Sequence, residues 1–407
     1  MINAAMLREL RMQLWQPPRP HGAARRDRVV GPLELFYDLV VVALIGQAAH
    51  HLTGHLTARG VVEFAVVFTI VWIAWLNGTL LHDLHGREDV RGRNSFMGQI
   101  LLLVPLGAAV PAAGGRHGRA VAVTAAMLFL LLAYLWWRVS QVDTPEFARP
   151  TRLYTAITLV LAAGFVASVP LGADARLVMW ACLAAGYLGS VAIVFHFVPG
   201  QLGEGVTVTE SLIERFSLLV IIVLGETVTG VVSGLTADPT SGRGLAVGII
   251  CVLAGFGAWW TYFDFVGHRS PHESRSATFS WLLSHLPVTA AITGMGASMP
   301  RLIDDAGLGR TPAAPTWMFC GSAMAVLLFT TVLMTSLEVW HSAADLLRPI
   351  AAANLVAAAV ALGVAVTRPA PLVLCLLLVL VFAGPWTFAV LRKAVVAAAV
   401  GNEVMRP

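Results

Sequence analysis

The sequence predicts an all-α integral membrane protein with about twelve transmembrane helices, and two observations lead to this fold class. Of the 407 residues, 57% are hydrophobic and 12% are charged. Soluble domains contain about 45–50% apolar and about 25% charged residues. The hydrophobic residues are also grouped into runs of about 20, which is the length of an α-helix that crosses the roughly 30 Å hydrocarbon core of a bilayer.

The predicted spans follow one another along the chain with short polar breaks between them. An Arg-rich segment, 1–32, precedes the first span. Its first residues have apolar side chains at helical spacing, which fits a short helix on the membrane surface as well as a disordered tail. The spans are predicted at 33–52, 60–81, 95–113, 119–138, 152–170, 176–197, 208–234, 244–266, 277–299, 316–339, 348–367 and 371–391.

The distribution of arginine and lysine predicts the orientation of these spans. Cytoplasmic loops of membrane proteins are enriched in both residue types. If the N-terminus is inside, the inside segments hold 18 of these residues and the outside loops hold 8. We therefore expect both termini in the cytoplasm.

An internal repeat predicts two six-helix halves. Four short matches occur in the same order in the first and second parts of the chain. Because six is an even number, both halves would have the same orientation in the membrane, as in parallel transporter repeats. The halves are 33–199 and 200–407, and the matches are 34–40 with 214–220, 72–77 with 259–264, Arg93 and Pro105 with Arg275 and Pro287, and 149–150 with 348–349.

Two carboxylates lie in the first span, although a charged residue at the centre of such a helix costs about 2.5–3.5 kcal/mol on insertion scales. Glu34 and Asp38 are four residues apart, so they lie on one helix face about one turn apart. If both are ionised they repel each other, and either a cation lies between them or one of them holds a proton. For Glu34, a first-turn position in the headgroup region is the alternative, because the helix dipole favours an acid there.

The seventh span repeats this pattern. Glu214 and Arg215 lie near its predicted cytoplasmic end, and Glu226 follows Glu214 by 12 residues. That separation is about 18 Å along the helix axis, so Glu226 is deep. Arg215 and Glu226 point to one side of the helix but lie too far apart for contact. Each therefore needs a partner from another helix.

Depth in the predicted spans groups these residues with others into one polar cluster. Asp264 and Asn77 hold matching places in the two halves, and His285 lies close to the midplane. Arg93 and Arg275 are boundary arginines at the start of the third span of each half. We interpret the cluster as a substrate or ion pathway, and the alternative is an ion-paired lock between the halves. Its members are Glu34, Asp38, Asn77, Arg93, Glu214, Arg215, Asp264 and Arg275, with Gln47, Glu226 and His285 deeper.

The sequence does not indicate a metal site, a cofactor or nucleic-acid binding. The four cysteines lie in apolar runs without C-x-x-C spacing, which predicts core residues rather than a disulfide framework or zinc ligands. The formal charge of +4 is attributed to orientation in the membrane. Tryptophans near the predicted span ends, among them Trp72, Trp75 and Trp137, are expected in the interfacial belts.

Several motifs together resemble the bacterial low-temperature requirement protein A family, and the resemblance extends from Val30 to about Arg392. It implies a multi-pass protein of a bacterial cytoplasmic (inner) membrane, and it implies no settled substrate or reaction. The family's motifs have Phe, Gly and Phe where this chain has Tyr37, Ser217 and Leu219. The motifs are ELFYDLVVVALIGQAAH at 34–50, ERFSLLVIIVLGET at 214–227, WWTYFD at 259–264 and SHLP at 284–287, and the family's acidic positions are present as Glu34, Asp38, Glu214, Glu226 and Asp264.

The repeat and the buried acids favour a secondary-transporter-like carrier, linked to a proton or cation, of an unknown solute. A channel lined by acids is a close variant. One alternative is a membrane-embedded enzyme on a lipid or isoprenoid, with Glu226 and His285 as acid and base. The sequence leans against it, because it has no D-D-x-x-D run, no histidine boxes inside the spans and no H-E-x-x-H motif, and we assign no catalytic residue. The other is a structural or regulatory membrane protein. The expected partners are the lipid bilayer and a small solute or ion, with a homo-oligomer left open.

Overall fold

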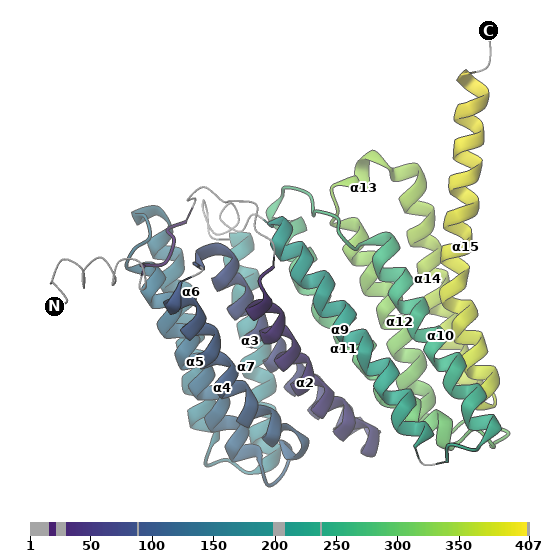
Figure 1. Ribbon diagram of the computed structural model, residues 1–407, viewed down its shortest axis with the longest axis horizontal. Coiled ribbons are helices and arrows are strands. Elements are labelled where there is room, and N and C mark those ends of the chain that lie inside the picture. The colour runs from purple at the N-terminus through teal and green to yellow at the C-terminus, as the bar shows by residue number, and fades with distance from the viewer. Residues whose placement is uncertain (1–15, 22–29, 88, 198–207, 237, 405–407) are drawn as a thin grey trace, which may run out of the picture. The chain divides into compact units, whose positions relative to one another are not determined.

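The computed structural model describes residues 16–21, 30–87, 89–197, 208–236 and 238–404, which form helices joined by short connections (Figure 1). A long helix covers each of the predicted spans, and no β-strand is present in this part of the chain. The long helices are α2 (Pro32–Gly54), α3 (Ala58–His85), α4 (Val90–Ala109), α5 (Gly118–Ser140), α6 (Pro145–Ser168), α7 (Ala173–Phe197), α9 (Glu210–Leu235), α10 (Gly242–Phe265), α11 (Arg275–Asp304), α12 (Ala313–Thr335), α14 (Ala344–Thr367) and α15 (Pro371–Val404), and the short ones are η1 (Val110–Ala112) and α13 (Val339–Ser342).

Within the described chain, 11 of these helices are long and apolar enough to cross a membrane. The long helix outside this group is α11, which has 30 residues but also a series of hydroxyl side chains and an imidazole. Those side chains are buried inside the protein, so α11 has less need of an apolar surface toward lipid. The predicted multi-pass helical membrane fold is confirmed. The buried polar residues of α11 are Thr278, Ser284, His285, Thr289, Thr293 and Ser298.

The helices divide into two compact units. The boundary falls inside α9, between Arg215 and Phe216. The predicted division into repeated halves at 199/200 rests on the sequence matches and stays a prediction. Unit 1 comprises residues 1–51, 59–215 and 274–276, and unit 2 comprises residues 52–58, 216–273 and 277–407.

In unit 1, α3 is the most enclosed of the spanning helices. Of its most apolar stretch, 89% is buried, compared with 50% or less in α2, α4, α5, α6 and α7. α5 packs against α4 and α6, and α6 packs against α7 (Figure 1). Because α3 contacts protein on nearly all sides, it can carry polar side chains that would be costly next to lipid. Its buried polar residues are Asn77, Thr79, His82, Asp83 and His85.

Unit 2 contains the second half of the helices and a close approach of two backbones. α10 packs against α12 and α15, and α14 packs against α12 and α15. A methyl group added at Gly230 of α9 would collide with the carbonyl oxygen of Gly296 in α11. Glycine at both positions therefore allows these helices to approach more closely than side chains would permit.

The expectation that tryptophans near the predicted span ends form interfacial belts is wrong for Trp72 and Trp75. Both side chains lie in the core of unit 1, with exposed fractions of 1% and 0%. Helix α3 extends to His85, beyond the predicted end of this span, so the two residues lie further from the helix end than expected. Trp137, which is 47% exposed, remains available to a lipid or interfacial environment.

Candidate functional site

The strongest candidate site is a buried ion pair in unit 1. The Nη2 of Arg215, in the first part of α9, lies 2.6 Å from Oδ1 of Asp38 in α2. The Nε of Arg215 also donates to Oδ2 of Asp38 at 3.3 Å, and the indole Nε1 of Trp75 donates to Oδ1 at 2.8 Å. The side chains of Asp38 and Arg215 are at most 1% exposed. Three helices, α2, α3 and α9, thus supply one charged contact away from water.

A pair of this kind is stable only while both charges are present. Removing two ions from water costs several kcal/mol each, and their mutual attraction offsets this only with good geometry and further hydrogen bonds. Trp75 supplies one such bond, whereas Nη1 of Arg215 has no hydrogen-bond partner within the described residues. Loss of the charge on Asp38 would therefore leave a buried guanidinium without its counter-ion.

Glu34 lies one turn before Asp38 and is also buried, with an exposed fraction of 4%. Its Oε2 accepts a hydrogen bond from the backbone N–H of Gly31 at 3.0 Å. The guanidinium of Arg215 interacts electrostatically with the carboxylate of Glu34 as well as with that of Asp38. Two acidic groups and one guanidinium therefore share this part of unit 1. If all three are ionised the local charge is negative, which favours a proton or a cation nearby.

A second polar contact surrounds Asn77, which the sequence places in the same cluster as Asp38. The side-chain amide of Asn77 donates to the hydroxyl of Tyr187 at 2.7 Å and to the carbonyl oxygen of Ile73 at 2.8 Å. The Tyr187 hydroxyl in turn donates to that of Tyr154 at 2.6 Å. Asn77 thus bonds to α7, and through it to α6, while Trp75 of the same helix bonds to Asp38.

Four of the other predicted site residues lie in unit 1 with more exposed side chains. Gln47 and Arg93 are exposed, and Glu214 and Arg275 are half-buried. Within the predicted cluster, Asp38 and Arg215 are joined directly by side-chain hydrogen bonds, and the sequence indicated that both need a partner. The structure thus supplies the partner from another helix that was expected for Arg215.

The remaining predicted site residues lie in unit 2. His285 is fully buried; its Nδ1 meets the carbonyl oxygen of Trp281 at 2.6 Å, and its Nε2 meets the hydroxyl of Tyr262 at 2.9 Å. Asp264 is half-buried and accepts a hydrogen bond from the indole of Trp386 at 2.9 Å. Glu226 is half-buried. In unit 2, therefore, His285 and Asp264 each form a side-chain hydrogen bond with an aromatic residue.

Sequence analysis missed Asp83, which lies at the end of α3 in unit 1. Its carboxylate accepts hydrogen bonds from the hydroxyl of Thr209, at 2.8 Å and 2.9 Å to the two oxygens, and from Ser211. Thr209 Oγ1 also accepts the backbone N–H of Leu212 at 3.0 Å, so it caps the start of α9. Part of the signal was available, because a threonine directly before a helix is a favoured N-cap residue, but nothing in the sequence pairs Thr209 with Asp83.

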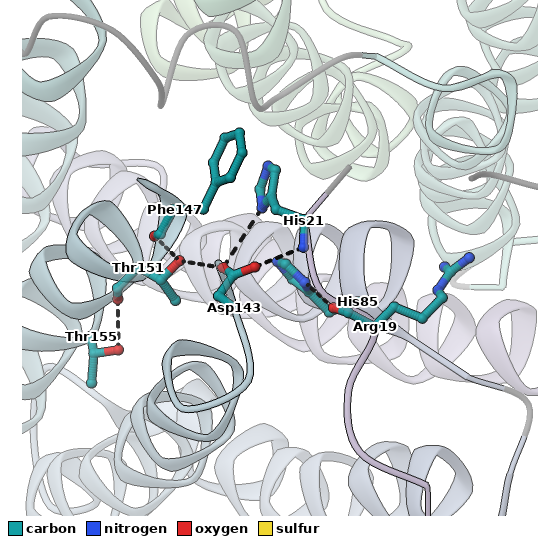
Figure 2. A network of polar contacts seen from close by, with 7 residues as sticks. All are labelled: Arg19, His21, His85, Asp143, Phe147, Thr151 and Thr155. Carbon is teal, nitrogen blue, oxygen red and sulfur yellow. Dashed lines mark hydrogen bonds and ion pairs between the residues drawn. The ribbon is translucent and has the colours of Figure 1, made fainter. Parts of the chain in front are cut away.

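The second missed feature is the segment Gln16–His21, which we call the strap. Figure 2 shows its end: the backbone N–H of His21 donates to Asp143 at 2.7 Å, and the His21 ring stacks on Phe147. Arg19 bonds to His85 twice, through its N–H to the His85 carbonyl and through its carbonyl to His85 Nδ1. The strap therefore lies across the ends of α3 and the α5–α6 connection. The further predictions for residues 1–15 lie outside the described residues.

Comparison with known proteins agrees with this architecture. No curated protein matches the chain in sequence. A family model described as Bacterial low temperature requirement A protein (LtrA) matches residues 29–383, a range that includes all the predicted site residues. The match covers most of the chain, and it agrees with the resemblance carried by the motifs around Asp38 and Arg215. This multi-pass helical membrane protein therefore belongs to the bacterial low temperature requirement A family.

Proposed function

We propose that this protein is a secondary-transporter-like carrier, linked to a proton or cation, and that the Asp38–Arg215 pair is its coupling site. The observation that supports this is a carboxylate with no exposed surface that meets a guanidinium from a distant part of the chain. Ionisable residues inside membrane spans are costly and are typical of ion and proton pathways. The solute remains an unknown small molecule or ion, and the membrane is expected to be a bacterial inner membrane with both chain termini in the cytoplasm.

The pair offers a simple coupling step. When Asp38 is ionised, it holds the start of α9 against α2 through two hydrogen bonds from Arg215. When Asp38 takes up a proton, the attraction is lost and Arg215 remains as a buried charge, which is strongly unfavourable. The contact between α2 and α9 thus has two states of different energy, and a proton selects between them. Glu34, one turn away, is the nearest further carboxylate in α2 that can exchange a proton or hold a cation.

A structural lock is the second candidate, and a specific observation favours it. Trp75 and Arg215 together already supply hydrogen bonds to both carboxylate oxygens of Asp38. A satisfied pair of this kind can fix the packing of α2, α3 and α9 without taking part in transport. The enzyme alternative has less support, because both ring nitrogens of His285 meet other groups of the protein.

Proton flux in proteoliposomes tests the proposal. The purified chain is reconstituted with an internal pH-sensitive dye, and a panel of candidate solutes is added to wild type and to Asp38→Asn. We expect solute-dependent proton movement in the wild type and its loss in Asp38→Asn. The matched control is Asp174→Asn, because the Asp174 side chain is 81% exposed and the same charge is removed. Asp174→Asn should retain the flux.

Charge reversal separates the carrier from the lock. The double variant Asp38→Arg/Arg215→Asp keeps one acid and one guanidinium on the same two helices but moves the carboxylate to α9. A lock tolerates this exchange if the protein folds, whereas a coupling site that depends on a proton at Asp38 does not. A folded double variant with full solute-dependent flux, or a wild type without flux across a broad panel, would contradict the proposal.

A further inference from the structure

A small cavity lies under the strap in unit 1, at the junction of α3, α4 and α5. Its volume is about 60 Å³. A site needs only about 10–15 Å³ of such volume to hold one water, so this cavity has room for a few waters or one compact polar group. Its lining comes from the strap (Gln16, Pro17, Pro18), the end of α3 and the turn after it (Leu81, His82, His85, Gly86, Arg87, Asp89), α4 (Arg91, Gly92, Ser95) and α5 (Leu135, Val139).

The charged lining of this cavity is mainly cationic. Arg87 donates from Nε to the Pro17 carbonyl at 2.8 Å and from Nη1 to the Gln16 side chain at 2.9 Å, and Arg91 donates from Nη1 to the Gln16 carbonyl at 3.0 Å. Within the described residues neither guanidinium forms an ion pair with a carboxylate, and Nη2 of each remains available. Arginine forks of this kind match the oxygens of a phosphate group.

Both carboxylate oxygens of the acid at the cavity, Asp89, already accept hydrogen bonds from backbone groups. Asp89 precedes α4 and caps it, because its Oδ1 accepts the backbone N–H of Gly92 at 2.8 Å. Its other oxygen accepts the backbone N–H of Gln16 at 3.0 Å. The carboxylate therefore holds the strap and the helix start, and the guanidinium groups at the cavity have no acidic partner among the residues that the structure describes. The positive end of the α4 dipole lies at the same place and also favours an anion.

Two further side chains of the lining have polar atoms without hydrogen-bond partners among the described residues. One is Nε2 of His85, whose side chain is only 3% exposed, and the other is Oγ of Ser95. Buried polar groups in proteins almost always have a partner, so such atoms at a cavity point to a bound group. A serine hydroxyl donates to an oxyanion. The Nδ1–H of His85 donates to the Arg19 carbonyl, so its Nε2 is an acceptor in the neutral ring and fits a hydroxyl of the bound group.

The position of the cavity along the helices places it near the phosphate groups of the lipids. It is formed at the end of α3 and the start of α4, two helices long enough to span the bilayer, so it is expected at the level of the lipid headgroups. Basic pockets between transmembrane helices at this depth bind anionic headgroups. We propose that this cavity binds a phosphate group, held by Arg87 and Arg91 with Ser95 and His85 as further contacts. This site is independent of the proposed carrier function.

The experiment uses the full-length protein and two probes that separate the sources of phosphate. In the first arm, radiolabelled inorganic phosphate is bound to protein in phosphatidylcholine nanodiscs, with chloride keeping the ionic strength constant. In the second arm, native mass spectrometry measures the phosphatidylglycerol and phosphatidylcholine retained by protein from mixed vesicles. We expect saturable binding in the first arm if free phosphate is the ligand, and selective retention of phosphatidylglycerol in the second if a headgroup is the ligand.

The variant Arg91→Gln should lower the binding seen in either arm by about tenfold, because a charged hydrogen-bond partner of the phosphate is lost. Arg152→Gln is the matched control, since Arg152 is exposed on α6, is absent from the lining and carries the same charge. If Arg91→Gln does not fold, Arg87→Gln replaces it, because the Arg87 side chain is exposed. Absence of binding in both arms, or an equal loss in the variant and in Arg152→Gln, would overturn the proposal.

Discussion

The Asp38 site of unit 1 and the His285 site of unit 2 bury polar side chains in different ways. Asp38 is held by a formal charge, Arg215, at 2.6 Å, with an indole as a further donor. His285 is held by a carbonyl oxygen and a tyrosine hydroxyl, neither of which carries a formal charge. Burying a charge without its partner costs far more than burying a neutral polar group. The comparison predicts that loss of a partner costs more at the Asp38 site than at the His285 site.

The largest effect is expected from Arg215→Met, which leaves the carboxylate of Asp38 buried without its counter-ion. We expect a loss of about 3–5 kcal/mol in the free energy of unfolding. Thermal unfolding of the detergent-solubilised protein measures it, with Asp38→Asn/Arg215→Met as the matched double variant. The double variant should recover most of the stability. A single variant as stable as the double one would show that Arg215 is not balancing a charge.

A smaller loss is expected from Asp83→Asn in unit 1. The charged acceptor of Thr209 and Ser211 becomes neutral, and hydrogen bonds to charged groups are worth about 1.5–3 kcal/mol. Unfolding in denaturant provides the measurement, and Thr209→Ser, which keeps the hydroxyl, serves as control. An unchanged midpoint for Asp83→Asn would mean that this carboxylate contributes little to the end of α3.

In unit 2, His285→Phe removes the imidazole, whose hydrogen-bond partners, unlike those of Asp38, carry no formal charge. The Tyr262 hydroxyl and the Trp281 carbonyl would each lose their contact with the ring, which costs about 1–3 kcal/mol. Thermal unfolding under the conditions used for Arg215→Met allows direct comparison. If His285→Phe is the more damaging of the two variants, the distinction between a charged and a neutral site fails.

The smallest effect is expected from Asp174→Asn at the surface of unit 1. Asp174 pairs with Arg59 at 2.7 Å, but the side chains are 81% and 55% exposed. Exposed ion pairs are screened by water and salt and contribute little. We expect an unchanged unfolding midpoint at low and at high salt. A salt-dependent decrease would show that surface charge matters here more than exposure suggests.

Hydropathy and length predicted the helices of this fold, because a span must be apolar and about 20 residues long whatever its neighbours are. The same argument indicated Asp38 and Arg215, since a charge inside such a segment needs a partner. It could not predict that they are partners of each other. That contact depends on which helices pack together, and hydropathy along one helix contains no such information.

Other features depend on packing in the same way. Trp75 is of a residue type that is common in interfacial belts. It is instead enclosed by neighbouring helices, and its indole donates to Asp38. Asn77, two positions later, points to another helix and bonds to Tyr187. The strap has no hydrophobic periodicity, and backbone groups make many of its contacts, so its residue types alone gave no signal.

The separation of Asp38 and Arg215 by 177 positions has a consequence for biosynthesis. Ribosomes add about 5–20 residues per second, so α2 leaves the ribosome roughly 9–35 s before the residue that neutralises it. During this interval the acid is expected to rely on the insertion machinery or on Trp75, which follows after a much shorter delay. We expect the membrane insertion of α2 to be less stable in chains truncated before α9 than in chains that extend beyond Arg215.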